Sequence, residues 1–151
     1  MSPLAGDQLA LLRVLARHGV EFVVVGGVAA QIHGWRGSTA DLDIAVSRDE
    51  ANVEPLNLAL RAVGAGDPAV GAFGSAFRTR YGRLEIVRRA HAIGDYDGWL
   101  GSAEAHALDD ELTVLVAAPA DILRSKEAAG REKDRAALPQ MRQDFADSGS
   151  A

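Results

Sequence analysis

Residues 39–46 read Thr-Ala-Asp-Leu-Asp-Ile-Ala-Val, and they follow a pair of glycines at positions 26 and 27. A β-strand sends alternate side chains to opposite faces of its sheet. The carboxylates of Asp41 and Asp43 are therefore predicted to leave one face together, while the apolar side chains of the stretch leave the other. Two acids held this close repel each other unless a positive charge lies between them. Because hard oxygen ligands suit Mg²⁺, which usually accompanies phosphates, the stretch indicates a nucleotide-handling enzyme.

The composition of the chain is that of an ordinary soluble protein. Its 151 residues, of which 48% are hydrophobic and 25% charged, suffice for one buried core. The formal net charge of -5 gives no overall sign of nucleic-acid binding, so a basic patch would have to be local. The absence of cysteine excludes disulfides and thiolate metal sites. Since neither a signal peptide nor a membrane-spanning apolar run is recognisable, we expect a cytoplasmic protein with no membrane partner.

Hydrophobic periodicity predicts alternating helices and strands in the first half of the chain. The predicted elements are a helix over 7–18, a buried strand over 21–26, a short helix over 27–33, a strand over 41–46 and a helix that ends near 63. Ser47 and Glu50 have the spacing of a capping box, which predicts that this last helix opens at Ser47.

The second half of the chain predicts a hairpin, one more strand and two helices. The elements are strands over 72–81 and 83–89, a strand over 111–117, a helix over 119–129 and a helix from 131 onward. The stretch 94–110 is loop-like. Pro139 is expected to kink or break the last helix because proline lacks an amide hydrogen. The order indicates an α/β (α+β) fold with a mixed, twisted sheet flanked by helices. We expect one domain over 1–146 and a flexible tail over 147–151.

Gly26 and Gly27 lie where the first predicted strand gives way to a helix. Glycine lets the backbone approach a phosphate, and a helix N-terminus presents free amides and a positive dipole end. Steric requirements alone also place glycine in such turns. The dinucleotide fingerprint and the P-loop are both absent, because neither spacing occurs here. Residues 28–40 leave room for one short helix and a loop, which would return Asp41 and Asp43 to the side of the glycines.

A third acid, Glu85, stands on a predicted strand that can neighbour the two aspartates. Arginines at 80, 83, 88 and 89 surround it, so Glu85 is alternatively a cross-strand ion-pair partner on an exposed hairpin. The arginines between 78 and 89 either steer a triphosphate or an RNA backbone, or they guard a solvated sheet edge. Both interpretations stay open.

The segment from Gly26 to Val46 resembles the signature of the DNA polymerase β-like nucleotidyltransferase superfamily. There a hydrophobic-Gly-Gly/Ser turn precedes an Asp-x-Asp strand and a third acid on a later strand. The run Leu123-Arg-Ser-Lys-Glu-Ala-Ala-Gly-Arg-Glu-Lys-Asp134 is similar to the tail of small bacterial members, which include the abortive-infection toxins of toxin–antitoxin pairs. The likeness covers residues 20–140. The third acid is often Asp in relatives, and larger relatives carry another domain for the acceptor.

The resemblance implies a nucleotidyltransferase-like fold and a Mg²⁺-dependent nucleotidyltransferase, with Mn²⁺ as an alternative metal. Asp41 and Asp43 would bind two Mg²⁺ ions, with Glu85 on the metal that activates the acceptor. The nucleotide-binding residues it implies are Gly26, Gly27, Ser38, Thr39, Lys126 and Asp134. The acceptor oxygen would attack the α-phosphorus of an NTP, and pyrophosphate would leave. The acceptor is an RNA end, a protein side chain or a small molecule.

The residues also permit a non-catalytic interpretation, in which the chain is a nucleotide-binding or antitoxin-like interaction module. Ser38 and Thr39 would then bond only the loop backbone, and Lys126 with Asp134 would be an interhelix ion pair. Against this, a site without catalysis has no reason to keep two adjacent carboxylates. In either case a homodimer or a separately encoded partner, such as a cognate antitoxin, is expected to supply further surface.

Overall fold

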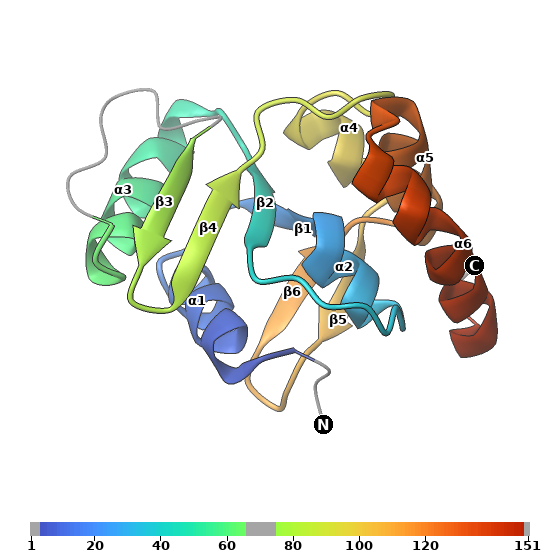
Figure 1. The fold of residues 1–151 in the computed structure, drawn as a ribbon. Coiled ribbons are helices and arrows are strands. Elements are labelled where there is room, and N and C mark those ends of the chain that lie inside the picture. Colours follow the sequence, from blue (N-terminus) through green and yellow to red (C-terminus); the bar gives the residue numbers. More distant parts are fainter. Residues whose placement is uncertain (1–3, 66–74, 150–151) are drawn as a thin grey trace.

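The computed structural model describes residues 4–65 and 75–149, and its centre is one mixed β-sheet (Figure 1). The strands lie in the order β3-β4-β2-β1-β6-β5. Their bounds are β1 Phe22–Val25, β2 Leu42–Val46, β3 Ala76–Thr79, β4 Gly82–Ile86, β5 Glu104–Ala107 and β6 Thr113–Val116. Strand β2 is antiparallel to β1 and parallel to β4, and β6 is parallel to β1. The mixed sheet predicted from the sequence is confirmed.

Helices flank this sheet. They are α1 Gly6–Arg17, α2 Gly26–Ile32, α3 Val53–Ala62, α4 Tyr96–Leu100, α5 Pro119–Ala129 and α6 Glu132–Ser148, with a 3₁₀ turn over Glu50–Asn52 before α3. Figure 1 shows α1 and α3 together behind β3 and β4, and the two helices pack against each other. Helix α2 packs against β1, β2 and α5, and α5 packs against α6. No helix in residues 4–65 and 75–149 combines the length and the apolar composition that crossing a bilayer demands.

Strand β1 runs through the middle of the core, and all of its side chains are buried. In β2 the alternate positions divide as predicted: Leu42 and Ile44 are fully buried on one face, while Asp43 occupies the other. Because β1 and β2 are antiparallel, Val25 at the end of β1 lies opposite Asp43 near the start of β2. The turn from β1 into α2 is therefore placed beside the aspartate.

The connection from β2 to α3 differs from the predicted capping box. Ser47 Oγ accepts a hydrogen bond from the Asp49 amide at 3.2 Å, and α3 begins only at Val53. The side chain of Asn52 holds this segment in place through hydrogen bonds to its backbone. Its Oδ1 accepts from the Glu21 amide at 2.8 Å, and its Nδ2 donates to the Ser47 carbonyl at 2.9 Å. The capping-box prediction is wrong because the Ser47 hydroxyl accepts from the Asp49 amide rather than from that of Glu50, and the Ser47 amide donates to the Glu21 carbonyl at 3.1 Å.

Elements of the second half also depart from the predictions. The stretch expected to be a loop holds α4 and β5, and α4 buries Trp99. A five-residue helix is too short to show a helical period, and β5 has no β-branched residue that would mark it. Strand β4 ends at Ile86 rather than at Arg89. The predicted start of the hairpin at 72–74 lies outside the described residues.

Helix α6 continues through Pro139, so of the two outcomes expected there, a kink or a break, the break does not occur. Its neighbours Leu138, Met141 and Phe145 are buried in the core, and their packing holds the helix on both sides of the proline. Helix α6 extends to Ser148 and so includes the first two residues of the expected tail, whose end at 150–151 lies outside the described residues. The loop after α2 is fastened to this end of α6. Ser148 Oγ donates to the His33 carbonyl at 2.6 Å, and Asp144 accepts from the Arg36 amide at 2.9 Å.

Candidate functional site

The structure brings the three predicted acids to one place on the sheet. Asp43 on β2 and Glu85 on β4 are register partners in the parallel pair. Partners in register point to the same face, so the two carboxylates lie side by side. Asp41 precedes β2 by one residue and contributes to the same electrostatic field, because both Asp41 and Glu85 raise the pKa of Asp43. From the sequence, Asp41 and Asp43 are predicted to lie together, whereas Glu85 stays open between a site acid and an ion-pair partner on the hairpin.

Asp43 is a carboxylate without sufficient counter-charge. Its pKa is raised to about 7 from 3.8, first by burial and then by the negative charges of Glu85 and Asp41. The positive charges of Lys126 and Arg83 oppose the shift but do not cancel it. Within the described residues, Asp43 Oδ1 is one of a few buried side-chain atoms that have no hydrogen-bond partner. A buried polar atom of this kind points to a ligand that binds there.

The turn after β1 approaches this carboxylate closely at Gly26. Its φ of +67° lies in the left-handed region, and a Cβ at this position would stand 2.5 Å from Asp43 Oδ2. Gly27 is required for a different reason. A Cβ there would stand 2.8 Å from Thr39 Cγ2, so this glycine makes room for the loop before β2. Of the two glycines, therefore, only Gly26 keeps the space between the start of α2 and the Asp43 carboxylate free of side-chain atoms.

Ser38 and Thr39 are less closely tied to the site. Thr39 packs on Gly27, and its hydroxyl lies 3.5 Å from the Asp41 carbonyl, which is a bond to the loop backbone. Ser38 is exposed in the same loop. The interpretation in which these two residues order the loop accounts for the contacts of Thr39.

Two cations face the carboxylates: Lys126 on α5 and Arg131, which immediately precedes α6. Lys126 Nζ lies 3.5 Å from Asp134 Oδ1, and Arg131 Nε lies 2.6 Å from Asp134 Oδ2. The side chain of Asp134 is fully buried. Its burial alone would raise its pKa, but the hydrogen bond from Arg131 and the charges of Lys126 and Arg131 outweigh burial, so the pKa lies below the ordinary value. Asp134 therefore holds both cations in place.

Arg131 was not singled out in the sequence, although it lies three residues before Asp134. Its pKa is raised first by the hydrogen bond to Asp134, and the negative charges of Glu85 and Asp43 add to this. That influence places Arg131 within electrostatic reach of both site carboxylates. Arg131 belongs to the run 123–134 that resembles the tail of small bacterial nucleotidyltransferases, and this was the sequence feature that could have indicated it. Spacing alone does not distinguish a residue that faces the site from one that faces solvent.

Arg83 contacts the site directly. Its Nη1 donates to Asp41 Oδ2 at 2.8 Å, and it lies two residues before Glu85 on β4, hence on the same face. One of the four arginines considered as ion-pair partners of Glu85, Arg83, pairs with Asp41 instead.

The chemistry of the side chains in the site suits a divalent cation, although their present arrangement does not form a metal-binding group. Within 4–65 and 75–149, no group of three or more His, Cys, Asp or Glu side chains is arranged to hold a metal ion. Asp41 is directed to Arg83. The donors nevertheless fit Mg²⁺, because they are hard carboxylate oxygens, one of them unpartnered, where negative charge is in excess. A cation at Asp43 would relieve the repulsion that raises its pKa.

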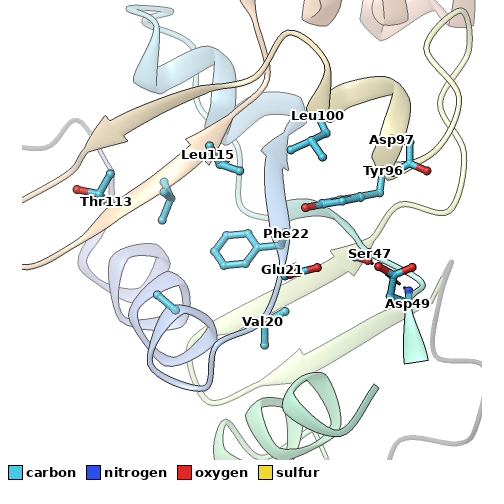
Figure 2. A pocket seen from close by; sticks show the side chains of 12 residues that line it. Val20, Glu21, Phe22, Ser47, Asp49, Tyr96, Asp97, Leu100, Thr113 and Leu115 are labelled. Atoms are coloured by element: carbon cyan, nitrogen blue, oxygen red, sulfur yellow. Dashed lines mark hydrogen bonds between the residues drawn. The ribbon is translucent and has the colours of Figure 1, made fainter. Parts of the chain in front are cut away.

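A separate cavity of about 560 Å³ lies at the other end of β1 (Figure 2). Phe22 and Leu100 give it apolar walls, and Tyr96 projects into it from α4. Burial raises the pKa of the Tyr96 hydroxyl, and the acids Glu21, Asp97 and Asp49 raise it further. None of the three convergent carboxylates lines this cavity. We therefore treat it as distinct from the carboxylate site.

Comparisons with known proteins support the fold. No protein family matches the chain, and no curated protein matches it either. A solved structure that is similar is that of an antigenic nucleotidyltransferase-like protein from Paracoccidioides brasiliensis. The two chains share 23% identity with a TM-score of 0.53, over 91% of this chain and 77% of that one. At this identity the likeness concerns architecture alone: the chain has a fold like that of a nucleotidyltransferase-like protein.

Proposed function

We propose that the protein is a Mg²⁺-dependent nucleotidyltransferase that moves a nucleoside monophosphate from an NTP to an acceptor hydroxyl. One observation carries the proposal: Asp43 and Glu85 lie in register with Asp41 beside them, and the buried Asp43 Oδ1 lacks a partner. The glycine turn adjoins one side of this group, and the cations Lys126 and Arg131 face it.

Each part of the site has a role in this reaction. Asp41, Asp43 and Glu85 would hold Mg²⁺, which when bound neutralises charge on the triphosphate. Lys126 and Arg131 attract the phosphates, and Asp134 keeps both side chains oriented. Gly26 keeps side-chain atoms away from the space next to Asp43. A bond forms between the acceptor oxygen and the α-phosphorus, the bond to pyrophosphate breaks, and the hydroxyl proton passes to solvent or to a site carboxylate.

The acceptor belongs to one of three chemical classes: an RNA end, a protein side chain or a small molecule. The proposal includes a cytoplasmic role as the toxin of a toxin–antitoxin pair, with a second copy of the chain or a cognate antitoxin as its partner. These parts of the proposal rest on the resemblance of the segments 26–46 and 123–134 to small bacterial nucleotidyltransferases.

A second function is favoured by one observation. The ion pair between Arg83 and Asp41 occupies a carboxylate that a metal would need, as expected for a module that binds nucleotide without catalysis. The unpartnered oxygen of Asp43 argues against this function, because a module of that kind gains nothing from a buried, uncompensated acid.

The experiment compares label transfer from each α-labelled NTP, with Mg²⁺ or Mn²⁺, to total RNA, to protein and to small hydroxyl compounds. Wild type is expected to transfer label to one acceptor class, and Asp41→Ala and Asp43→Ala are expected to lose this activity. Asp97→Ala, which removes an acid from the separate cavity, is the matched control and should retain it. NTP-dependent thermal stabilisation without transfer to any acceptor would favour the binding module instead.

A further inference from the structure

The cations near the carboxylates differ in how firmly they are held. Lys126 and Arg131 are both anchored by the fully buried carboxylate of Asp134. Arg83 is anchored by Asp41, whose side chain is 32% exposed, and Arg83 itself is 51% exposed. An ion pair open to solvent in this way changes an equilibrium by at most about fivefold. The contact between Arg83 and Asp41 is therefore readily exchanged for a stronger one.

The position of this exchangeable cation matters because Asp41 is a candidate metal ligand. A divalent cation that binds Asp41 must displace the guanidinium, which leaves two positive groups close together. A triphosphate changes this balance. Phosphate oxygens accept two parallel hydrogen bonds from a guanidinium, and such contacts are stronger than a single exposed carboxylate pair.

We propose that Arg83 couples metal binding to nucleotide binding: it holds Asp41 until an NTP arrives, and then transfers to the phosphates and leaves Asp41 free for the divalent cation. This inference rests on the function proposed above and extends it to a residue outside the acidic and glycine motifs. It accounts for a donor set that suits Mg²⁺ although its side chains are not arranged as a metal group within the described residues. The site would then take metal and nucleotide together and would bind free metal poorly.

The neighbouring strand offers a matched control. Arg78 on β3 lies directly opposite Arg83 in the antiparallel pair, so the two side chains leave the same face of the sheet. Arg78→Gln removes the same charge from nearly the same place. It separates a general change in electrostatic potential from loss of the contact with Asp41.

The test measures Mn²⁺ binding by electron paramagnetic resonance, with and without a non-hydrolysable NTP analogue. Arg83→Gln is expected to bind Mn²⁺ alone about fivefold more tightly than wild type. The gain in Mn²⁺ affinity that the analogue causes should shrink by at least the same factor. Arg83→Lys should behave between the two, since it keeps the charge and loses the bidentate geometry. Arg78→Gln should remain within about twofold of wild type.

Two results would overturn the inference. One is an unchanged Mn²⁺ affinity in Arg83→Gln, and the other is an equal effect of Arg78→Gln. The proposed function fails in a different way, which Asp41→Asn reports. If that variant binds Mn²⁺ with the wild-type affinity both with and without the analogue, the metal site itself is misassigned. If it loses binding while Arg83→Gln changes nothing, the metal site stands and the coupling by Arg83 is refuted.

Discussion

Replacing Asp43 by Asn should stabilise the metal-free protein at high pH and not at low pH. The pKa of Asp43 in the folded chain is raised to about 7 from 3.8, chiefly because the side chain is buried. Between about pH 4 and about pH 7, the folded chain keeps a proton that the unfolded chain has lost. The free energy of unfolding therefore falls as pH rises through this window, and the full penalty is present above about pH 7. The shift corresponds to about 4 kcal/mol at most.

Urea denaturation followed by circular dichroism, in the presence of a chelator, measures this penalty. At about pH 8.5 the variant should exceed wild type in stability by about 3 kcal/mol more than it does at about pH 5, because about two of the three pH units of the shift lie between these values. Asparagine leaves an amide in place of the carboxylate, and any cost of burying it is common to both pH values, so it cancels in this comparison. Millimolar Mg²⁺ together with a non-hydrolysable NTP analogue should stabilise wild type at the higher pH and stabilise the variant less, because the variant lacks the Asp43 carboxylate.

Asp41→Asn is the control for the assay. Its carboxylate reaches solvent and pairs with Arg83, so its removal should be neutral or destabilising at the higher pH, by up to about 1 kcal/mol. A stability difference between Asp43→Asn and wild type that does not vary with pH would refute the reasoning, since the acid would then carry no uncompensated charge. An equal gain in Asp41→Asn would mean that net charge, rather than burial of one group, governs stability.

Two further substitutions test the residues that surround the carboxylates. Gly26→Ala should lower the free energy of unfolding by roughly 1–2 kcal/mol, because the residue has a left-handed backbone conformation. It should also weaken Mn²⁺ binding, because the new Cβ would press on Asp43. Gly101→Ala, whose Cβ meets nothing within 4 Å, is the control and should leave metal binding unchanged. Equal Mn²⁺ affinity in the two variants would contradict the close approach. Asp134→Asn should cost about 3 kcal/mol in urea denaturation, because it removes the buried partner of Lys126 and Arg131. It should also reduce thermal stabilisation by NTP, and unaltered stabilisation by NTP would show that the anchor is dispensable.

The acidic group could be predicted from the sequence because its determinants are local. Alternate side chains of a strand leave the same face, so a strand over 41–46 predicts that Asp41 and Asp43 lie together; in the structure Asp41 lies one residue before β2. The glycine pair and the short interval after it placed the turn beside them. Glu85 was harder, because its role depends on β4 lying next to β2, and that adjacency is not encoded in the spacing of either strand.

The remaining features are consequences of tertiary packing. Helix α4 and strand β5 are too short for periodicity to reveal them, and β5 is recognisable only through its pairing with β6. Pro139 is tolerated because buried neighbours hold α6 on either side of it, a fact about the core rather than about proline. Arginine is common on protein surfaces, so the sequence does not single out Arg83 and Arg131; their contacts with Asp41 and Asp134 in the folded chain do.

The fastening of α6 to the loop after α2 has a mechanical consequence. Near its first turn the helix carries Asp134, which anchors two cations, and near its last turn Asp144 and Ser148 grip Arg36 and the carbonyl of His33. The helix has 17 residues, so it spans about 25 Å as one rigid strut. The helix joins Lys126 and Arg131, through Asp134, to the loop after α2, through Arg36 and His33. Helix α6 therefore connects the cations on one side of the site to the loop after α2 on the other, and an outward movement of either is expected to move the other.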